Sequence, residues 1–183
     1  MMPIAITSTD ARYPTQLRDR LGDDAPAQLA TLGNLDLLAL PQTAFFCSTR
    51  CPGHVILPAY DQAARWRDAG RCIISGFHSP VEQECLRILL RGTQPIIICP
   101  ARALPQRIPP EWRTALTAGR LLLLSGFTSA EKRITTELAT RRNTLAAALA
   151  DEVYFAHITP GGKSEHLTHL LARWHVPYST LVR

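Results

Sequence analysis

Six short apolar runs, separated by amphipathic stretches, dominate the chain from residue 43 to its end. Each run has only five or six residues and is rich in leucine or β-branched side chains, which is typical of buried strands rather than helices. The predicted strands span residues 43–47, 71–75, 95–99, 120–125, 152–157 and 178–182.

The amphipathic stretches between these runs predict helices. Signals that end a helix are found at Gly70, Gly92 and Gly119. A typical N-cap and first-turn pair is found at Ser79 and Pro80. The predicted helices span residues 57–69, 80–90, 110–118, 129–150 and 164–174. Strands that alternate with helices over short connections indicate an extended Rossmann-like α/β fold, with a mostly parallel sheet and helices on both of its faces.

The first 42 residues lack this alternation. Tyr13-Pro14, Pro26 and Gly33-Asn34 are turn or breaker signals, and short helices are predicted around them at residues 15–21 and 35–40. We therefore divide the 183-residue chain into a short helical N-terminal arm, residues 1–42, and a Rossmann-like domain, residues 43–183.

Arginine carries almost all of the positive charge. Of the 20 lysine and arginine residues only Lys132 and Lys163 are lysines, and the formal net charge is +5. The planar guanidinium forms paired hydrogen bonds with phosphate, so this excess favours a nucleic acid or a nucleotide as partner. A GC-rich genome, which encodes arginine in place of lysine, explains the same excess without such a partner.

Several classes of function find no support in the sequence. A GxGxxG fingerprint is absent, and Gly161-Gly162-Lys163-Ser164 lacks the earlier glycine of a P-loop, so we expect no cofactor. The five cysteines form no CxxC pair, which argues against a disulfide framework or a zinc site and favours a reducing cytoplasm. The apolar runs are too short to cross a bilayer and no secretory signal is recognised, so we expect no membrane partner.

Small and hydroxyl-bearing residues follow the predicted strands. Ser48-Thr49-Arg50, Ser75-Gly76 and the segment from Thr159 to Ser164 each come directly after a strand. The carboxyl ends of parallel strands meet at one edge, so these residues predict a rim of hydroxyls, backbone N–H groups and helix N-termini that holds phosphate, with Arg50 and Lys163 as countercharge. Any single turn is better explained by ordinary turn residues and N-caps.

Other chemistry-bearing residues have simpler structural explanations. His166 and His169 lie three residues apart without the further ligands that zinc needs, and Cys51 has no identifiable histidine partner. Glu82 is either a general acid/base or a first-turn acid that complements the helix dipole, and the second role is favoured. We expect no catalytic residue and no metal ligand, and we expect core packing rather than base stacking for Trp66, Trp112 and Trp174.

Five motifs follow one another along nearly the whole chain. They are Tyr13-Pro14-Thr15-Gln16-Leu17 with Leu29 and Leu32-Gly33-Asn34, then Phe46–Arg50, Gly70–Gly76, Arg141–Ala146 and Gly161–Ser164. In order and spacing they resemble the DNA-processing protein A (DprA/Smf) family, which has YPxxL with LxxxG, a strand ending in Gly-Ser/Thr-Arg, a strand ending in Ser-Gly, a helix with Arg-Asn-Arg-Ile-Ile-Ala and a later Ser-Gly turn. Ser48 replaces a glycine of that family, and Thr144 replaces the second arginine.

This resemblance implies an extended Rossmann domain that binds single-stranded DNA, usually as a homodimer, and that helps to load the recombinase during natural transformation. It also implies a basic pocket near Arg50, Lys132, Arg133, Arg141, Arg142 and Lys163, in which phosphate contacts set affinity with little base readout. Together with the strand-end residues and Asn143 of the helix motif, the predicted phosphate-binding set is Ser48, Thr49, Arg50, Ser75, Gly76, Lys132, Arg133, Arg141, Arg142, Asn143, Gly161, Gly162, Lys163 and Ser164.

A second function stays open because the superfamily to which the DprA/Smf family belongs also contains enzymes. Its cytokinin-activating phosphoribohydrolases carry a Pro-Gly-Gly-x-Gly-Thr-x-x-Glu turn, to which residues 159–165 are loosely similar. The alternative is therefore a nucleotide-binding sensor or a nucleotide phosphoribohydrolase, in which Glu82 is the candidate general acid/base.

Overall fold

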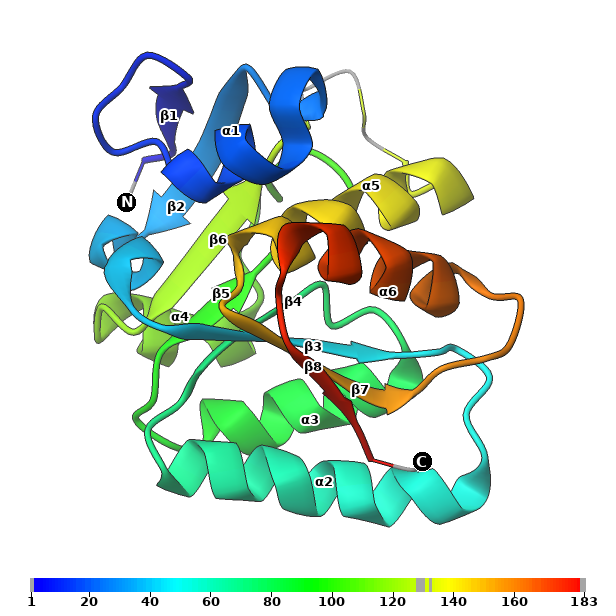
Figure 1. Cartoon of the computed structure of the whole chain (residues 1–183). Helices are drawn as coiled ribbons and strands as arrows, with labels where there is room; N and C mark the ends of the chain where they lie inside the picture. The colour runs from blue at the N-terminus through cyan, green and yellow to red at the C-terminus, as the bar shows by residue number, and fades with distance from the viewer. Residues whose placement is uncertain (1, 128–130, 132, 182–183) are drawn as a thin grey trace.

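One eight-stranded sheet organises the chain (Figure 1), as seen in a computed structural model that describes residues 2–127, 131 and 133–181. The order of the strands across the sheet is β1-β2-β6-β5-β4-β3-β7-β8, and the six strands from β3 to β8 are parallel. The strands are β1 (Ile4–Thr7), β2 (Gln28–Gly33), β3 (Gln42–Cys47), β4 (Cys72–Ser75), β5 (Ile96–Ile98), β6 (Leu121–Ser125), β7 (Glu152–His157) and β8 (Tyr178–Thr180).

Helices cover both faces of this sheet. Leucines of α1, α5 and α6 pack against one face, and apolar side chains of α2, α3 and α4 pack against the other, which Figure 1 shows as layers above and below the sheet. The predicted extended Rossmann-like α/β class is thus confirmed. The helices are α1 (Thr15–Leu21), α2 (Gly53–Asp68), α3 (Pro80–Leu90), α4 (Pro110–Thr117), α5 (Thr136–Leu149) and α6 (Lys163–Trp174), with two 3-10 turns, η1 (Gly22–Asp24) and η2 (Leu35–Ala39).

The central strands are apolar on both faces because each face meets a helical layer. In β3, Ala44 and Phe46 belong to the core cluster under α5 and α6, whereas Phe45 and Cys47 belong to the cluster under α2 and α3. This alternation explains why the strands appear in the sequence as continuous apolar runs.

The direction in which strands are added reverses at β3. From β3 the chain adds β4, β5 and β6 on one side, then crosses back to place β7 on the other side of β3. The carboxyl ends of β3 and β7 therefore flank the topological switch point, which is where open α/β sheets bind ligands.

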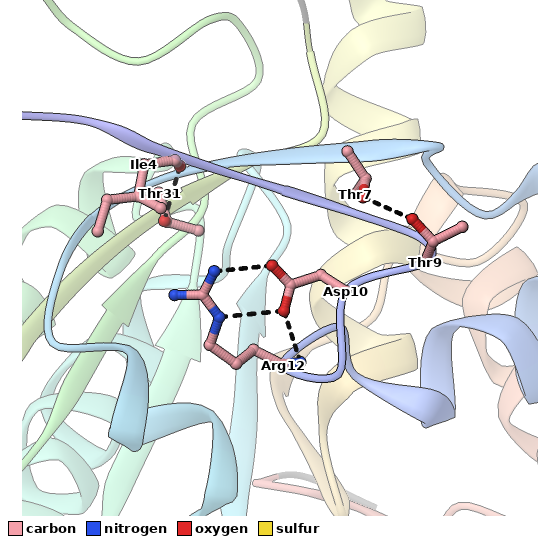
Figure 2. A network of polar contacts seen from close by, with 6 residues as sticks. All are labelled: Ile4, Thr7, Thr9, Asp10, Arg12 and Thr31. Atoms are coloured by element: carbon pink, nitrogen blue, oxygen red, sulfur yellow. Dashed lines mark hydrogen bonds and ion pairs between the residues drawn. The ribbon is translucent and has the colours of Figure 1, made fainter.

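The first 42 residues join the same sheet. The predicted helices at 15–21 and 35–40 correspond to α1 and η2, but β1 and β2 were not predicted; β2 pairs antiparallel with β6 and β1 with β2. Figure 2 shows how this edge is fastened: the Thr31 hydroxyl donates to the Ile4 carbonyl at 2.9 Å, and Arg12 pairs with Asp10. The Arg12 hydrogen bonds hold the pKa of Asp10 at about 2. A boundary at residue 42 stays a prediction.

Two helix starts differ from the predictions by more than one residue. α2 begins at Gly53 and carries Pro58 in its second turn, whereas the prediction placed that proline in the first turn. α5 begins at Thr136, because the Thr135 hydroxyl caps it by accepting from the Leu138 N–H at 3.2 Å. The long Ala- and Leu-rich pattern gave no signal for a start this late.

Candidate nucleic-acid interface

Ser48 bridges the two strands of the switch point. Its hydroxyl donates to the His157 carbonyl at 3.1 Å, accepts from the Thr159 N–H at 3.3 Å and lies 3.4 Å from the Ser164 hydroxyl. One side chain thus connects the turn after β3 with the turn after β7 and with the first turn of α6. A phosphate oxygen lying directly against residue 48 would have to displace these bonds, so an anion has to bind farther out along the rim.

Two helices begin at this rim without side-chain caps. Pro52 precedes α2 and Gly162 precedes α6, and neither residue has a side chain that accepts a hydrogen bond from the helix. By contrast, Ser79 caps α3 and Thr135 caps α5. Uncapped N-termini present backbone N–H groups and the positive end of the helix dipole, which are the elements of an anion site.

Arg50 and Lys163 bring positive charge to the same rim. The loops after β3 and after β7 lie at one edge of the molecule (Figure 1), and Thr49, Arg50 and Lys163 are exposed there. The Lys163 ammonium donates to the Thr136 carbonyl at 3.1 Å, which ties α6 to the start of α5. Arg50 forms no hydrogen bond or ion pair with any residue that the structure describes. Its guanidinium is therefore available to a ligand.

The turn after β7 is held by its own contacts. Gly161 has a φ of 70° and its N–H donates to the Glu165 carboxylate at 2.6 Å, while the Gly162 N–H donates to the Thr159 carbonyl. A Cβ at Gly162 would lie 2.8 Å from that carbonyl oxygen, so the residue must be small. The structure thus brings the predicted residues Ser48, Thr49, Arg50, Gly161, Gly162, Lys163 and Ser164 together at one rim.

A second group of predicted residues is buried behind this rim. Ser75 is fully buried and its hydroxyl accepts from the Phe77 N–H, while Arg142 is only 4% exposed. The Arg142 guanidinium donates to the Asn143 side chain at 2.7 Å and to the Cys99 carbonyl at 3.3 Å. A Cβ at Gly76 would lie 1.3 Å from a nitrogen of this guanidinium. Gly76 therefore makes room for Arg142. The contacts of Ser75, Gly76 and Arg142 explain these residues structurally, in place of the phosphate contact that the sequence predicted for them.

The buried carboxylate of Glu82 fixes the ends of β3 and β4. It accepts from the N–H groups of Cys47, His78 and Ser79, at 2.8, 2.8 and 3.1 Å, and the Ser79 hydroxyl completes a capping box at the start of α3. Burial lowers the pKa of the Arg142 guanidinium, and the nearby negative charge of Glu82 opposes this lowering. The favoured role of Glu82 as a first-turn acid is confirmed.

The remaining predicted residues lie on α5 and before it. Arg141 is exposed, stacks over the Phe127 ring at 5.3 Å and lies 3.7 Å from Glu131, while Arg133 is exposed and Lys132 lies outside the described residues. Asn143 lines a small cavity together with Lys163. Arg141 instead faces a groove of about 960 Å³ between η1, α5 and α6. The cavity and the groove adjoin, because Thr140, Thr144 and His166 line both of them.

The charges of that groove are balanced. The residues that line it include three arginines, Arg20, Arg141 and Arg173, and three carboxylates, Asp23, Asp24 and Glu137. A phosphate backbone would meet as much repulsion as attraction there. The rim around Arg50 is the better candidate for an anionic polymer.

The described residues offer little support for the other chemistry considered. No three histidine, cysteine or carboxylate side chains among them could hold a metal ion. Burial raises the pKa of the Cys72, Cys85 and Cys99 thiols to about 12, which makes them poor nucleophiles. Trp66 packs in the core against Phe45 and Tyr154, and Trp112 and Trp174 are partly buried against it. None of the helices in the described part of the chain has both the length and the apolar character of a membrane span.

Some of these side-chain contacts could not be predicted from the sequence. The pattern Ser79-x-x-Glu82 is a capping-box signal, so the role of Glu82 is readable locally. The packing of Arg142 on Gly76 joins residues far apart in the chain and leaves no local signal. The same holds for Arg20 of α1, which donates to the Ala148 and Ala150 carbonyls at the end of α5.

Known proteins share both the sequence pattern and the fold. A sequence profile of the family described as DNA recombination-mediator protein A matches residues 4–159, whereas no curated protein matches the chain. DNA processing protein A (DprA) from Streptococcus pneumoniae has a TM-score of 0.79 at 20% identity, over 97% of this chain and 62% of its own. This chain therefore spans less than two thirds of the length of that protein.

Two further structures complete the comparison. DNA processing protein A from Helicobacter pylori, described for its unique single-stranded DNA binding mode, has a TM-score of 0.77 at 19% identity, over 100% of this chain and 82% of its own. The molybdenum cofactor carrier protein from Chlamydomonas reinhardtii is more distant, with a TM-score of 0.50 at 12% identity over 76% of this chain and 75% of its own. At these identities the likeness shows the fold alone.

Proposed function

Because this chain belongs to the DNA recombination-mediator protein A family, we propose that it binds single-stranded DNA through phosphate contacts at the carboxyl edge of its sheet. The phosphates contact the outer part of the rim, formed by Thr49 and Arg50 after β3 and by residues 161–164 after β7, while Ser48 holds the two turns together behind them. Binding of this kind depends on the phosphate backbone and varies little with base sequence.

Arg50 carries this proposal. It is an exposed guanidinium, without a partner among the described residues, in the turn after β3 at the topological switch point. Lys163 and the uncapped N-termini of α2 and α6 surround the same turn. A net charge of +5 adds long-range attraction for an anionic polymer. The single-stranded DNA binding described for the H. pylori relative supports the same class of ligand.

The nucleotide sensor or phosphoribohydrolase is the less favoured function. A hydrolase needs a carboxylate that is free to exchange a proton with substrate. Glu82 is buried and accepts from three backbone N–H groups, and Glu165 accepts from the Gly161 N–H within its own turn. Both carboxylates thus already have structural partners.

The wider role follows from the family and is part of the proposal. We infer that the protein acts in DNA processing during natural transformation, in the reducing cytoplasm that the cysteine content favours. A homodimer and a recombinase partner are the assemblies expected for such a role. Size measurement in solution and co-purification with a recombinase filament test these two expectations.

Replacement of Arg50 tests the proposal directly. Arg50→Ala is expected to weaken binding of a labelled oligothymidylate by about 1–3 kcal/mol, or about 5- to 150-fold, because one charge-assisted contact is lost. Fluorescence anisotropy titration measures this change. Arg91→Ala is the matched control, since Arg91 is exposed at the far end of α3 and its loss removes the same charge.

These variants distinguish DNA binding at the rim from attraction of DNA by the net charge of the protein. We expect Arg91→Ala to stay within about twofold of the unmodified protein, and Arg50→Lys to recover part of the affinity, because it keeps the charge but not the planar fork. Equal losses for Arg50→Ala and Arg91→Ala would contradict the rim, because they would indicate that net charge alone sets the affinity.

A further inference from the structure

The turns at the carboxyl edge of the sheet are bonded to one another in the order of the strands. Strands β7, β3, β4, β5 and β6 are successive neighbours, and a turn follows each of them at this edge. Ser48 connects the turns after β7 and β3. The Glu82 carboxylate connects the turns after β3 and β4, because it accepts from the N–H groups of Cys47 and His78, each at 2.8 Å. These turns therefore hold fixed positions relative to one another.

The same framework continues to β5 and β6. The N–H of Cys99, directly after β5, donates to the carbonyl of Ser75, the last residue of β4, at 2.8 Å. The hydroxyl of Ser125, the last residue of β6, donates to the Arg102 carbonyl at 2.8 Å. The backbone of Arg102 is therefore fixed at the carboxyl edge, where β5 and β6 end.

The side chain of Arg102 is exposed on this fixed backbone. Its neighbour Ala101 is buried against Phe127 and Leu138, and Leu104 packs against the core cluster under α2 and α3. The Arg102 guanidinium itself forms no hydrogen bond or ion pair with any residue in the described part of the chain. Anchored neighbours on both sides thus hold an arginine whose charged group is free for a ligand.

Four successive turns each carry an exposed basic side chain. These four side chains, which we call the basic row, are Lys163 after β7, Arg50 after β3, His78 after β4 and Arg102 after β5. Neighbouring strands lie about 4.8 Å apart, so three steps from β7 to β5 span about 14 Å. Successive phosphates of one DNA strand lie about 3.4 Å apart along a duplex axis, so the basic row matches the length of a few nucleotides.

The carboxylates near the basic row have partners of their own. Glu82 is buried and accepts from backbone N–H groups, and Glu165 accepts from the Gly161 N–H at 2.6 Å. The Glu131 carboxylate lies 3.7 Å from Arg141. The negative charges beside the row are thus bound to donors, in contrast to the groove over α5, where arginines and carboxylates balance. An anionic polymer therefore meets more attraction than repulsion along the row.

We propose that Arg102 is a further phosphate-binding residue, and that a single DNA strand crosses the edge of the sheet from Lys163 over Arg50 and His78 to Arg102. The inference rests on the function proposed above and extends its site by two turns. Arg102, like Arg50, has a planar guanidinium that forms paired hydrogen bonds with a phosphate, and the His78 ring offers a single N–H donor. Because the four side chains are spread over about 14 Å, they fit the backbone of a polymer rather than one phosphate.

The first measurement compares Arg102→Ala with Arg113→Ala in titrations of a labelled dodecathymidylate. We expect Arg102→Ala to lose at least about fivefold in affinity and to make the log–log salt slope less negative by about 0.7, which is the contribution of one phosphate contact on a single strand. Arg113, exposed on α4, is the matched control, and its loss should change affinity by less than about twofold. The fold of Arg102→Ala is retained because Ser125 bonds the main-chain carbonyl, and an unchanged melting temperature checks this.

The second measurement maps the path of the strand. A dodecathymidylate that contains thiothymidine is cross-linked to the unmodified protein by near-ultraviolet light, and mass spectrometry identifies the linked peptides. We expect links to the peptides that contain Arg50 and Arg102. Links confined to the turns after β7 and β3, or equal affinities of Arg102→Ala and Arg113→Ala, would overturn the extended path. If Arg50→Ala also left the affinity unchanged, or the unmodified protein bound no oligothymidylate, the proposed function itself would fail.

Discussion

Two buried charged side chains organise the residues behind the candidate interface. Arg142 and Glu82 form no direct ion pair, yet each is satisfied by backbone groups or an amide, because an uncompensated buried charge is strongly destabilising. The guanidinium holds the carboxyl end of β5 through Cys99, and the carboxylate holds that of β3 through Cys47. Together they keep the strand ends in place beneath the rim.

Gly76→Ala tests the packing of Arg142. We expect the free energy of unfolding to fall by about 2–3 kcal/mol, because the new methyl group would overlap the guanidinium and force it from its hydrogen bonds. Urea denaturation measures the change. Gly53→Ala is the control, since a Cβ there meets nothing within 4 Å, and we expect it to stay within about 0.5 kcal/mol of the unmodified protein. Similar values for both variants would refute the close packing at residue 76.

At the scale of elements, periodicity and punctuation predicted the domain from β3 onward. The six predicted strands and five predicted helices after residue 42 correspond to β3–β8 and α2–α6, because continuous apolar runs and glycine stops are strong signals. β1 and β2 were missed since each lies at the antiparallel margin of the sheet, where Ile4, Thr7 and Gln28 are exposed and the apolar pattern is short. The pairing of β2 with β6, and of β1 with β2, is a tertiary effect.

The docking of α1 on α5 gives a prediction at this scale. Arg20 donates to the Ala148 and Ala150 carbonyls at 3.0 and 2.6 Å and so closes the end of α5 from a distant part of the chain. Arg20→Ala is expected to lower the free energy of unfolding by about 1–3 kcal/mol. Arg113→Ala, on the exposed side of α4, removes an arginine without such bonds and should change stability by less than about 0.5 kcal/mol. If calorimetry gave equal melting temperatures for the two variants, the cap would be unimportant.

At the scale of the whole molecule, the sequence predicted that strand-end turns meet at one edge but not which side chains face it. The rim contains Arg50 and Lys163 as expected, whereas Ser75, Gly76 and Arg142 pack behind it and Arg141 faces the charge-balanced groove that adjoins it. Spacing along a helix cannot decide between a buried and an exposed guanidinium. That choice depends on the cavity that Gly76 leaves and on the carbonyl of Cys99.

The buried thiols predict the alkaline stability of the whole fold. Burial raises the pKa of Cys72, Cys85 and Cys99 to about 12 from the value of 9.0 that an exposed thiol has. Above about pH 9 the unfolded chain loses these protons and the folded chain keeps them, so the free energy of unfolding falls as pH rises toward 12. Each thiol contributes up to about 1.4 kcal/mol per pH unit. Urea denaturation between pH 8 and pH 10.5 measures the slope, and Cys99→Ala should reduce it; an unchanged slope would contradict the assignment.

The dependence of DNA affinity on salt tests the proposed rim most directly. Titrations of the protein with a short oligothymidylate and with thymidine monophosphate, each at two salt concentrations, separate a polymer site from a nucleotide site. For two to four phosphate contacts on a single strand we expect a log–log slope between about −1.4 and −2.8 for the oligonucleotide, and much weaker binding of the mononucleotide. Tight mononucleotide binding, together with an oligonucleotide affinity that does not respond to salt, would contradict the account.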